Sequence, residues 1–253
     1  RFTVCGGAAL TPEVAQLFIG LGIPVTQGYG LTETAPIITA NPLENNEPAS
    51  VGLPLPGIEV KVTSDDELLT RSPCVMLGYW NNPEATSGII DDEGWLHTGD
   101  KVTIAESGHI HITGRLKDII VLANGEKVPP SDMENAIVLD ELVDQVLLIG
   151  EGRPYLSALI VPNRDVFARV AEELHLDPTD ESICTDENIR SIFMQHVQQC
   201  TASFPGYAQV RQLAVVNEPW TPDNGLATPT LKLRRKQILE RYHEITEQLY
   251  AGH

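Results

Sequence analysis

Apolar positions near the start of the chain follow first the spacing of a helix and then that of a strand. Between Thr11 and Gly22 they recur at i, i+3, i+4 and i+7, which predicts a helix that faces a core. The stripe consists of Val14, Leu17, Phe18 and Leu21. Thr11 stands at the expected N-cap, Pro12 at the first helical position and Gly22 beyond the end. The segment "IPVTQGYG" then predicts a strand leading into a glycine loop, the usual setting of a nucleotide site in an α/β fold.

Residues 50–115 have a different pattern, with short apolar runs separated by Gly, Pro and acidic turns. The strand candidates are "GIEVKV", "ELLTRSP", "KVTIAE" and "GHIHITGR". We expect a small, mostly antiparallel β unit that begins at about residue 50.

The pattern changes again after the charged segment 115–118. In "IIVLANGEKV" two apolar runs flank Asn124-Gly125, which predicts a hairpin with a type I′ turn. Ser131, followed three residues later by Glu134, predicts a helix opened by a capping box. Two strands are expected in "DQVLLIGEGRPYLSALIVP". Helices are expected at 166–174, at 188–200 and near the C-terminus, the last with Ile238, Tyr242, Ile245 and Leu249 on one face. The pattern predicts a separate α+β domain here.

Composition narrows the class of protein. The chain has 253 residues, 42% of them hydrophobic, and it contains no apolar run of the roughly 18 residues that a membrane helix requires. Its four cysteines are scattered without a CxxC pair, which disfavours a zinc site or disulfide framework and favours a reducing cytoplasm. The first residue is Arg1 rather than Met, so we expect an internal portion of a longer protein.

Charge excludes one class of partner. The net charge is −18, from 35 acidic and 17 basic residues, and this argues against nucleic-acid binding, which needs a basic face. An anionic ligand must therefore be held by a few local cations. The main cationic cluster is "LKLRRKQILER" in residues 231–241.

The loop "QGYGLTETAP" in residues 27–36 combines groups suited to a nucleotide phosphate. Gly28 and Gly30 let the backbone approach a ligand closely. Thr32 can hydrogen-bond an anionic oxygen, and Glu33 is a hard oxygen ligand suited to Mg²⁺. A turn that leads into a helix would favour the same residue types, so the loop alone leaves both interpretations open.

Four ordered segments together are more specific: "CGGAAL", "GYGLTET", "GWLHTGD" with "GRLKD" after it, and "TPTLKLRR". Their order and spacing resemble the adenylate-forming superfamily. The segments "NGLATPTLKLRR" and "RLKDIIVLANGEKVPP" are most similar to its long-chain fatty acyl-CoA synthetase branch. The resemblance implies an α/β plus α+β fold. Residues 1–116 would be the C-terminal portion of the large AMP-binding domain, including the β subdomain, and residues 117–253 a small mobile lid.

The resemblance also implies an activity. A fatty acid would attack the α-phosphate of ATP to give acyl-AMP and pyrophosphate, and CoA would then displace AMP. The implied ligands are ATP/AMP, Mg²⁺ and coenzyme A, without nucleic acid. The implied location is the cytoplasm, with peripheral contact at the inner face of the membrane as an alternative. Three other functions stay open: a non-catalytic AMP-binding or interaction module, a fatty acyl-AMP ligase, and an aryl-CoA synthetase.

Positions that match the family motifs receive roles by resemblance. Gly7 and Ala8 would lie flat against adenine, and Tyr29 would stack on its ring, although a strand-to-helix turn and a core tyrosine would look the same. Thr32 would donate to an α-phosphate oxygen and Glu33 would bind Mg²⁺; a solvated glutamate at a helix start is the alternative for Glu33.

The later motifs supply the remaining roles. Asp100 would accept hydrogen bonds from both ribose hydroxyls, and Arg115 would contact ribose or phosphate oxygens; a turn aspartate and a surface ion pair are the alternatives. Lys232 would stabilise charge in the transition state, and a solvated lysine within the basic run is the alternative. Lys117 matches the family's hinge, and Gly125 would line the pantetheine tunnel, or serve only the turn.

Several positions near these motifs need separate interpretations. Arg234, Arg235 and Lys236 fit a solvent-facing helix surface, with contact to a CoA phosphate as an alternative. Leu231 stands where the family commonly has Gly before its catalytic lysine. The family's Ser/Thr/Gly-rich phosphate loop is not found in the sequence. His109 and His111 would share one face of a strand, but without a third ligand in sight they do not favour a metal site.

Overall fold

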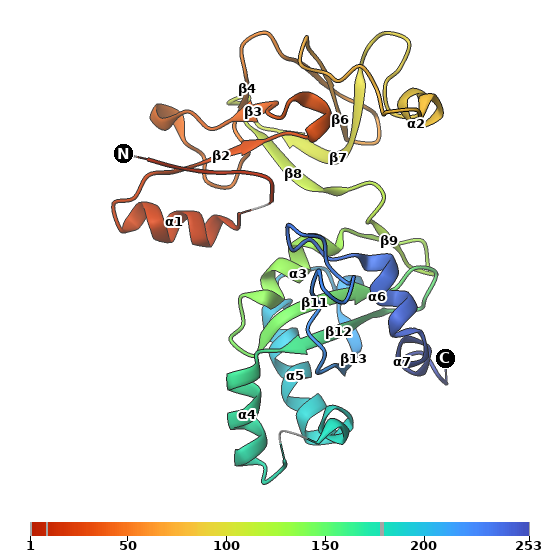
Figure 1. Cartoon of the computed structure of the whole chain (residues 1–253). Coiled ribbons are helices and arrows are strands. Elements are labelled where there is room, and N and C mark those ends of the chain that lie inside the picture. The colour runs from red at the N-terminus through yellow and green to blue at the C-terminus, as the bar shows by residue number, and fades with distance from the viewer. Residues whose placement is uncertain (1, 9, 178–179, 253) are drawn as a thin grey trace. The chain divides into compact units, whose positions relative to one another are not determined.

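The computed structural model describes residues 2–8, 10–177 and 180–252. The chain divides into two compact units, residues 1–118 and residues 119–253, and each is described by itself (Figure 1). None of the helices in the described part of the chain has both the length and the hydropathy needed to cross a bilayer.

Unit 1 opens with a parallel β-α-β arrangement. Strand β1 (Thr3–Cys5), helix α1 (Pro12–Gly20) and strand β2 (Val25–Tyr29) follow in order, and β1 pairs with β2 in parallel register. Two short antiparallel strands, β3 (Thr39–Ala40) and β4 (Leu53–Pro54), extend this sheet in the order β1-β2-β3-β4. The helix and the strand predicted before the glycine loop are both confirmed.

The prediction that α1 turns its apolar stripe toward a core is wrong for this structure. Leu17, Phe18 and Leu21 are 61%, 41% and 67% exposed, and Ala15 is the buried residue of the helix. Periodicity identified an amphipathic helix but could not show what covers its apolar face. The N-cap position at Thr11 is confirmed, but its side chain forms no capping hydrogen bond.

The second sheet of unit 1 is an antiparallel meander. It has the order β5-β6-β7-β8, with helix α2 inserted between β6 and β7. The elements are β5 (Glu59–Val62), β6 (Glu67–Arg71), α2 (Pro83–Ser87), β7 (Leu96–Ile104) and β8 (Ile110–Arg115). Leu68, Val102 and Ile110 form its buried core. The small antiparallel β unit expected from the short apolar runs and the turns between them is confirmed.

Unit 2 begins with the predicted hairpin, but its turn differs from the prediction. Strands β9 (Ile120–Val121) and β10 (Lys127–Val128) are antiparallel. The main-chain N–H of Leu122 donates to Glu126 O, so three residues form the loop. Gly125 has a φ of 86°, whereas Asn124 is not left-handed as a type I′ turn requires. The turn is therefore of the three-residue kind with glycine at the left-handed position.

A three-stranded sheet covered on both faces forms the body of unit 2 (Figure 1). Its order is β11-β12-β13, with β11 and β12 antiparallel and β12 and β13 parallel. Residues of the helices α3, α4 and α5 pack on one face, and those of α6 and the segment before it pack on the other. The elements are α3 (Pro130–Val138), β11 (Val143–Ile149), β12 (Leu156–Pro162), α4 (Arg164–Glu173), α5 (Glu187–Cys200), β13 (Val210–Val215), α6 (Arg235–Arg241) and α7 (His243–Gln248).

Most of the elements expected in unit 2 are present, with two corrections. The predicted capping box is wrong: α3 begins at Pro130, and the carboxylate of Glu134 accepts a hydrogen bond from the N–H of Leu148 at 2.7 Å instead. The C-terminal helix is interrupted at Tyr242, which separates α6 from α7. The first of these differences arises from a contact between residues far apart in the sequence.

Candidate functional site

Three of the predicted site residues meet in unit 1. Tyr29 ends β2, Asp100 lies in β7, and Arg115 ends β8 directly opposite Asp100. The hydroxyl of Tyr29 donates to Asp100 Oδ2 at 2.6 Å, and Arg115 Nε donates to Oδ1 at 2.7 Å. Asp100 is 3% exposed, whereas 53% of the Arg115 side chain is exposed. Each carboxylate oxygen has a second lone pair, so this buried acceptor can still receive a pair of hydroxyls.

The charges of this trio are set by burial and by the Asp100 carboxylate. Burial of Tyr29, followed by the negative charge of Asp100, raises the pKa of Tyr29 well above its usual range, so its hydroxyl stays a donor. Burial works against the charge of Arg115, but the attraction of Asp100 outweighs it and raises the pKa of Arg115. A neutral phenol and a guanidinium therefore both point at one carboxylate.

A bulge in β7 aims Asp100 at this position, and the residues that hold it were not singled out in the sequence. Gly99 has a φ of 72°, and its N–H donates to Glu67 Oε1 at 3.0 Å. Glu67 Oε2 also lies 2.9 Å from Nδ1 of His97. The hydroxyl of Thr98 donates to a main-chain oxygen of β6 and accepts the N–H of Asp100 at 3.1 Å. His97 and Thr98 could have been found because they lie inside "GWLHTGD"; Glu67 carries no comparable signal.

The glycine loop after β2 is packed closely against its own chain. A Cβ on Gly30 would lie 1.8 Å from the main-chain oxygen of Pro36, so internal packing alone accounts for this glycine. At Gly28 a Cβ would make an ordinary contact of 3.5 Å with Thr39 O. Gly7, by contrast, has a φ of 84° and open space around it. Ala8 follows Gly7 at the carboxyl end of β1, beside the carboxyl end of β2.

Thr32 and Glu33 lie in a short 3-10 helix, η1 (Thr32–Thr34), directly after this loop. Thr32 is exposed. The hydroxyl of Tyr79, which the sequence did not point out, donates to Glu33 Oε1 at 2.7 Å. This hydrogen bond to Glu33 is the main cause of a raised pKa of Tyr79. Buried Thr34, also missed, closes the turn by accepting the N–H of Leu31 at 3.0 Å.

The donor set at Glu33 suits Mg²⁺ rather than a metal held entirely by protein. Glu33 offers a partly exposed carboxylate whose orientation Tyr79 fixes. Among the described residues, no three His, Cys, Asp or Glu side chains gather in a way that could hold a metal ion. Mg²⁺ is commonly bound by one or two carboxylates together with substrate phosphates, and one such carboxylate is present.

The two histidines noted in the sequence serve contacts within unit 1. His109 is buried, and its Nε2 donates to the main-chain oxygen of Asn45 at 3.0 Å. His111 Nε2 lies 3.1 Å from Glu47 Oε1, and His109 Nδ1 lies 3.4 Å from Glu47 Oε2. The pair thus ties the start of β8 to the loop at residues 45–47.

Lys232 lies in unit 2, in a tight turn that begins at Thr228. The N–H of Thr228 donates to Lys232 O at 2.8 Å, and the N–H of Lys232 donates to the Thr228 hydroxyl at 3.0 Å. Within the described part of the chain, the Lys232 ammonium has neither a hydrogen bond nor an ion pair. Leu231 has a φ of 62°, a left-handed conformation that favours glycine, which gives a physical reason for the family's usual Gly at this position.

The prediction that Arg234, Arg235 and Lys236 all cover a solvent-facing surface is wrong at Arg235. Its guanidinium donates to Glu134 at 2.7 Å and to the main-chain oxygen of Leu148 at 2.6 Å. Arg234 is exposed, and the side chain of Lys236 is 82% exposed. One residue of this basic run, Arg235, therefore makes tertiary contacts that the sequence did not reveal.

The remaining predicted positions lie at turns. Lys117 is exposed and follows β8, where the N–H of Asp118 donates to Arg115 O at 3.1 Å. Gly125 has open space where a Cβ would stand, so its left-handed φ is what the hairpin demands. These positions are consistent with a connecting segment and a hairpin tip.

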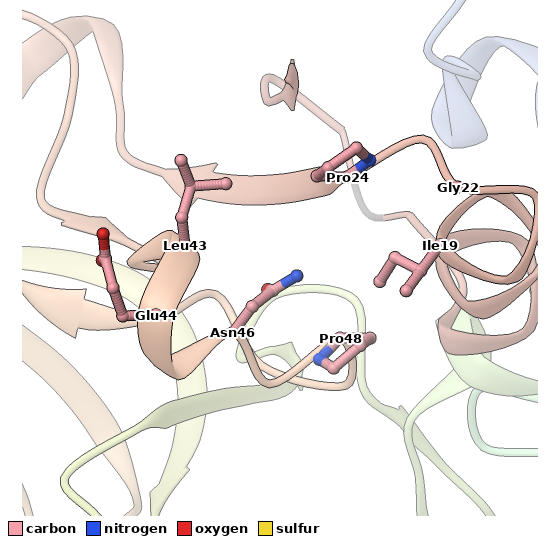
Figure 2. Close-up of a pocket in the computed structure, with 7 residues that line it drawn as sticks. All are labelled: Ile19, Gly22, Pro24, Leu43, Glu44, Asn46 and Pro48. Atoms are coloured by element: carbon pink, nitrogen blue, oxygen red, sulfur yellow. The ribbon is translucent and has the colours of Figure 1, made fainter. Parts of the chain in front are cut away.

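A pocket of about 430 Å³ lies away from the predicted residues (Figure 2). It is bounded by the end of α1, the residue before β2 and the segment after β3, so it lies at the opposite end of β2 from Tyr29. Its lining residues are Ile19, Gly22, Pro24, Leu43, Glu44, Asn46 and Pro48. The constellation around Asp100 remains the candidate site.

Comparison with known proteins points in the same direction. Residues 117–253 match the family model described as the AMP-binding enzyme C-terminal domain, and residues 1–80 match the model described as AMP-binding enzyme. The chain is 34% identical to the chloroplastic long-chain-fatty-acid–[acyl-carrier-protein] ligase AEE15 of Arabidopsis thaliana, over 98% of the chain. It is 31% identical to the long-chain-fatty-acid–CoA ligase FadD15 of Mycobacterium bovis, over 99% of the chain.

Similarity to solved structures confirms the fold class. The adenylation domain of a carboxylate reductase from Mycobacterium chelonae matches with a TM-score of 0.81 and 26% identity, covering 98% of this chain and 38% of that one. The chain spans only 35% of the length of the Arabidopsis relative and 42% of the length of the mycobacterial ligase.

Proposed function

This chain belongs to the family of AMP-binding enzymes, and we propose that it forms the nucleotide-binding edge and the C-terminal unit of an adenylate-forming acyl ligase. The observation that carries the proposal is the buried Asp100 carboxylate, held between Tyr29 and Arg115 at the carboxyl end of β2. Ligands of open α/β sheets commonly bind at the carboxyl ends of the strands.

Different residues of unit 1 contact different parts of the nucleotide. Asp100 accepts the ribose hydroxyls, and Tyr29 packs against adenine beside the open backbone at Gly7 and Ala8. Arg115 provides the adjacent guanidinium for a ribose or phosphate oxygen.

Residues near the phosphates serve the reaction itself. Thr32 donates to an α-phosphate oxygen, and Glu33, oriented by Tyr79, holds Mg²⁺. The metal ion, when bound, offsets phosphate charge. Lys232 stabilises the charge that develops as the carboxylate adds to phosphorus.

The finer assignment is a long-chain fatty acid–CoA ligase. The relatives named above support a fatty acid as the acid and a thiol as the acceptor. A change of backbone torsion at Lys117 reorients unit 2 between the two half-reactions, and the hairpin at Gly125 lines the path of the pantetheine arm. One relative is named for an acyl-carrier protein, so CoA and carrier protein must be compared directly.

Calorimetry with AMP tests the nucleotide site on the 253-residue chain. We expect weak AMP binding, with at least tenfold loss in Asp100→Ala because each lost hydrogen bond to a charged group contributes about 1.5–3 kcal/mol. The preference for AMP over 2′,3′-dideoxy-AMP disappears in this variant. Asp92→Ala, at an exposed carboxylate of the same unit, serves as the control. Equal affinity of Asp100→Ala and the unchanged chain would contradict the assignment.

Activity is tested in the complete protein that contains this sequence. We expect Lys232→Ala to slow pyrophosphate exchange by about 10²–10³ while ATP still binds. Lys236→Ala should exchange normally. Exchange by Lys232→Ala at a near-normal rate would refute the role of Lys232. A panel of carboxylic acids, with CoA or carrier protein, then identifies the acid and the acceptor; adenylation without transfer to either would indicate an acyl-AMP ligase.

A further inference from the structure

Arg235 occupies a position that local electrostatics disfavour. It is the first residue of α6, it is followed by Lys236, and the first turn of the helix contains no acidic residue. The amino end of a helix carries partial positive charge, so cations there are destabilising rather than stabilising. A tertiary interaction must therefore account for an arginine at this position.

The guanidinium of Arg235 makes that interaction with α3 and β11. Nη1 donates to Glu134 Oε1 at 2.7 Å, and Nη2 donates to the main-chain oxygen of Leu148 at 2.6 Å. The same Glu134 oxygen accepts the N–H of Leu148 at 2.7 Å. The side chains of Arg235 and Glu134 are only 25% and 16% exposed.

The ion pair between Arg235 and Glu134 supplies hydrogen-bond partners for main-chain groups at the edge of the sheet. Leu148 lies in β11, which is an edge strand in the order β11-β12-β13. An edge strand leaves main-chain N–H and C=O groups without a strand partner. Glu134 takes the N–H of Leu148 and Arg235 takes its C=O, so the start of α6 is attached to a strand in the core of unit 2.

Lys232 lies three residues before this attachment. Hydrogen bonds also join this turn to the residues that precede Lys232. The hydroxyl of Thr228 accepts the N–H of Lys232 at 3.0 Å, and the N–H of Arg234 donates to Leu226 O at 2.9 Å. The backbone of the turn is therefore fixed at both ends while the ammonium extends from an exposed side chain.

We propose that Arg235, together with Glu134, is a positioning residue for Lys232, fixing the carboxyl-terminal end of its turn to the sheet of unit 2. This inference rests on the role of Lys232 proposed above. Arginine is required because its planar fork reaches two different acceptors, Glu134 and Leu148 O, whereas a lysine ammonium is a single point of donation. A displacement of about 1 Å in a catalytic group can cost about 10²-fold in rate.

Amide hydrogen exchange on the 253-residue chain tests the attachment without substrates. In Arg235→Gln three amides should exchange at least tenfold faster: those of Leu231 and Lys232, which donate to Thr228, and that of Arg234, which donates to Leu226 O. The control Lys236→Gln should leave these rates unchanged. Unchanged rates in Arg235→Gln would overturn the proposal. If Arg235→Gln unfolds unit 2, Arg235→Lys is used instead, because it keeps a positive charge opposite Glu134. Its amide exchange rates are then compared with those of Lys236→Gln, and unchanged rates would again overturn the proposal.

Kinetics in the complete protein test the consequence for Lys232. Arg235→Lys should lower kcat of adenylation about tenfold or more with the KM for ATP unchanged, and it should have no further effect in a Lys232→Ala background, because the two residues act as a unit. If Lys232→Ala is inactive while Arg235→Lys matches the unchanged protein, the positioning role is refuted. Full activity of Lys232→Ala would instead refute the proposed function of Lys232, and the exchange experiment would still decide the attachment.

Discussion

At the residue scale, the hydroxyl of Tyr29 makes stability depend on pH. Burial and the Asp100 carboxylate raise the pKa of Tyr29 above the ordinary tyrosine value of about 10. Above that pH the unfolded chain has lost the proton while the folded chain retains it, so the unfolded state binds fewer protons. The free energy of unfolding therefore falls as pH rises. The contribution of Tyr29 is complete below pH 10 and decreases above it.

We expect Tyr29→Phe to be less stable than the unchanged chain by about 1 kcal/mol at pH 8, because Asp100 loses a donor. The difference should narrow between pH 10 and pH 11, since phenylalanine does not titrate. Urea unfolding followed by circular dichroism at each pH measures this. Tyr207→Phe, at an exposed tyrosine, is the control. A difference that stays constant from pH 8 to pH 11 would contradict the assignment.

The residues named from motifs and those found only in the structure differ in a consistent way. Asp100 and Arg115 could be named because they lie in adjacent motifs, and the antiparallel pairing of β7 and β8 brings them opposite each other. Glu67 and Tyr79 orient Gly99 and Glu33, but they come from elsewhere in the chain. Sequence patterns therefore identified the groups proposed to contact the nucleotide, but not the groups that orient them.

At the element scale, α1 shows the limit of periodicity. Its apolar stripe predicted the helix correctly, but Leu17 and Leu21 are exposed. We expect Leu17→Gln and Leu21→Gln to change the free energy of unfolding of this chain by less than about 0.5 kcal/mol, because surface substitutions with similar helix propensity have small effects.

Ala15→Gln provides the matched comparison on the same helix. Ala15 is 1% exposed, so adding a longer side chain there should cost about 1–3 kcal/mol through overpacking. Thermal unfolding of the three variants measures both outcomes. If Leu17→Gln destabilises the chain as much as Ala15→Gln, the exposed orientation of the stripe is wrong.

Strands and hairpins were more predictable than the details of their ends. Short apolar runs between turn residues predicted the mostly antiparallel unit that contains β5–β8, and Asn124-Gly125 located the hairpin. The sequence did not determine the type of the hairpin turn, because an Asn-Gly pair fits both a two-residue and a three-residue loop. Glu134 matched a capping box, yet its carboxylate binds Leu148 and Arg235. The capping box does not form here because Arg235 and Leu148 offer Glu134 a guanidinium and a main-chain N–H.

At the scale of the whole molecule, each unit has a core of its own. In unit 2, the buried residues on both faces of the three-stranded sheet all come from 119–253. The sequence indicated a change of pattern near residues 115–118. It did not show which face of the sheet each residue joins, because apolar residues are consecutive at 146–149 in β11 and at 158–161 in β12. The reorientation of unit 2 proposed above requires that this unit keeps its packing without contacts from unit 1.

We therefore expect residues 119–253, produced alone, to fold and to unfold in one cooperative transition. Trp220 is 1% exposed and packs in the core of this unit, so its fluorescence reports the transition, whereas Trp80 and Trp95 belong to unit 1. The urea midpoint from Trp220 should match between the isolated unit and the whole chain, because its hydrophobic burial is internal. A shifted midpoint or a non-cooperative transition in the isolated unit would show that its core depends on unit 1. It would also remove the physical basis for a unit that turns about Lys117 with Lys232 held in place.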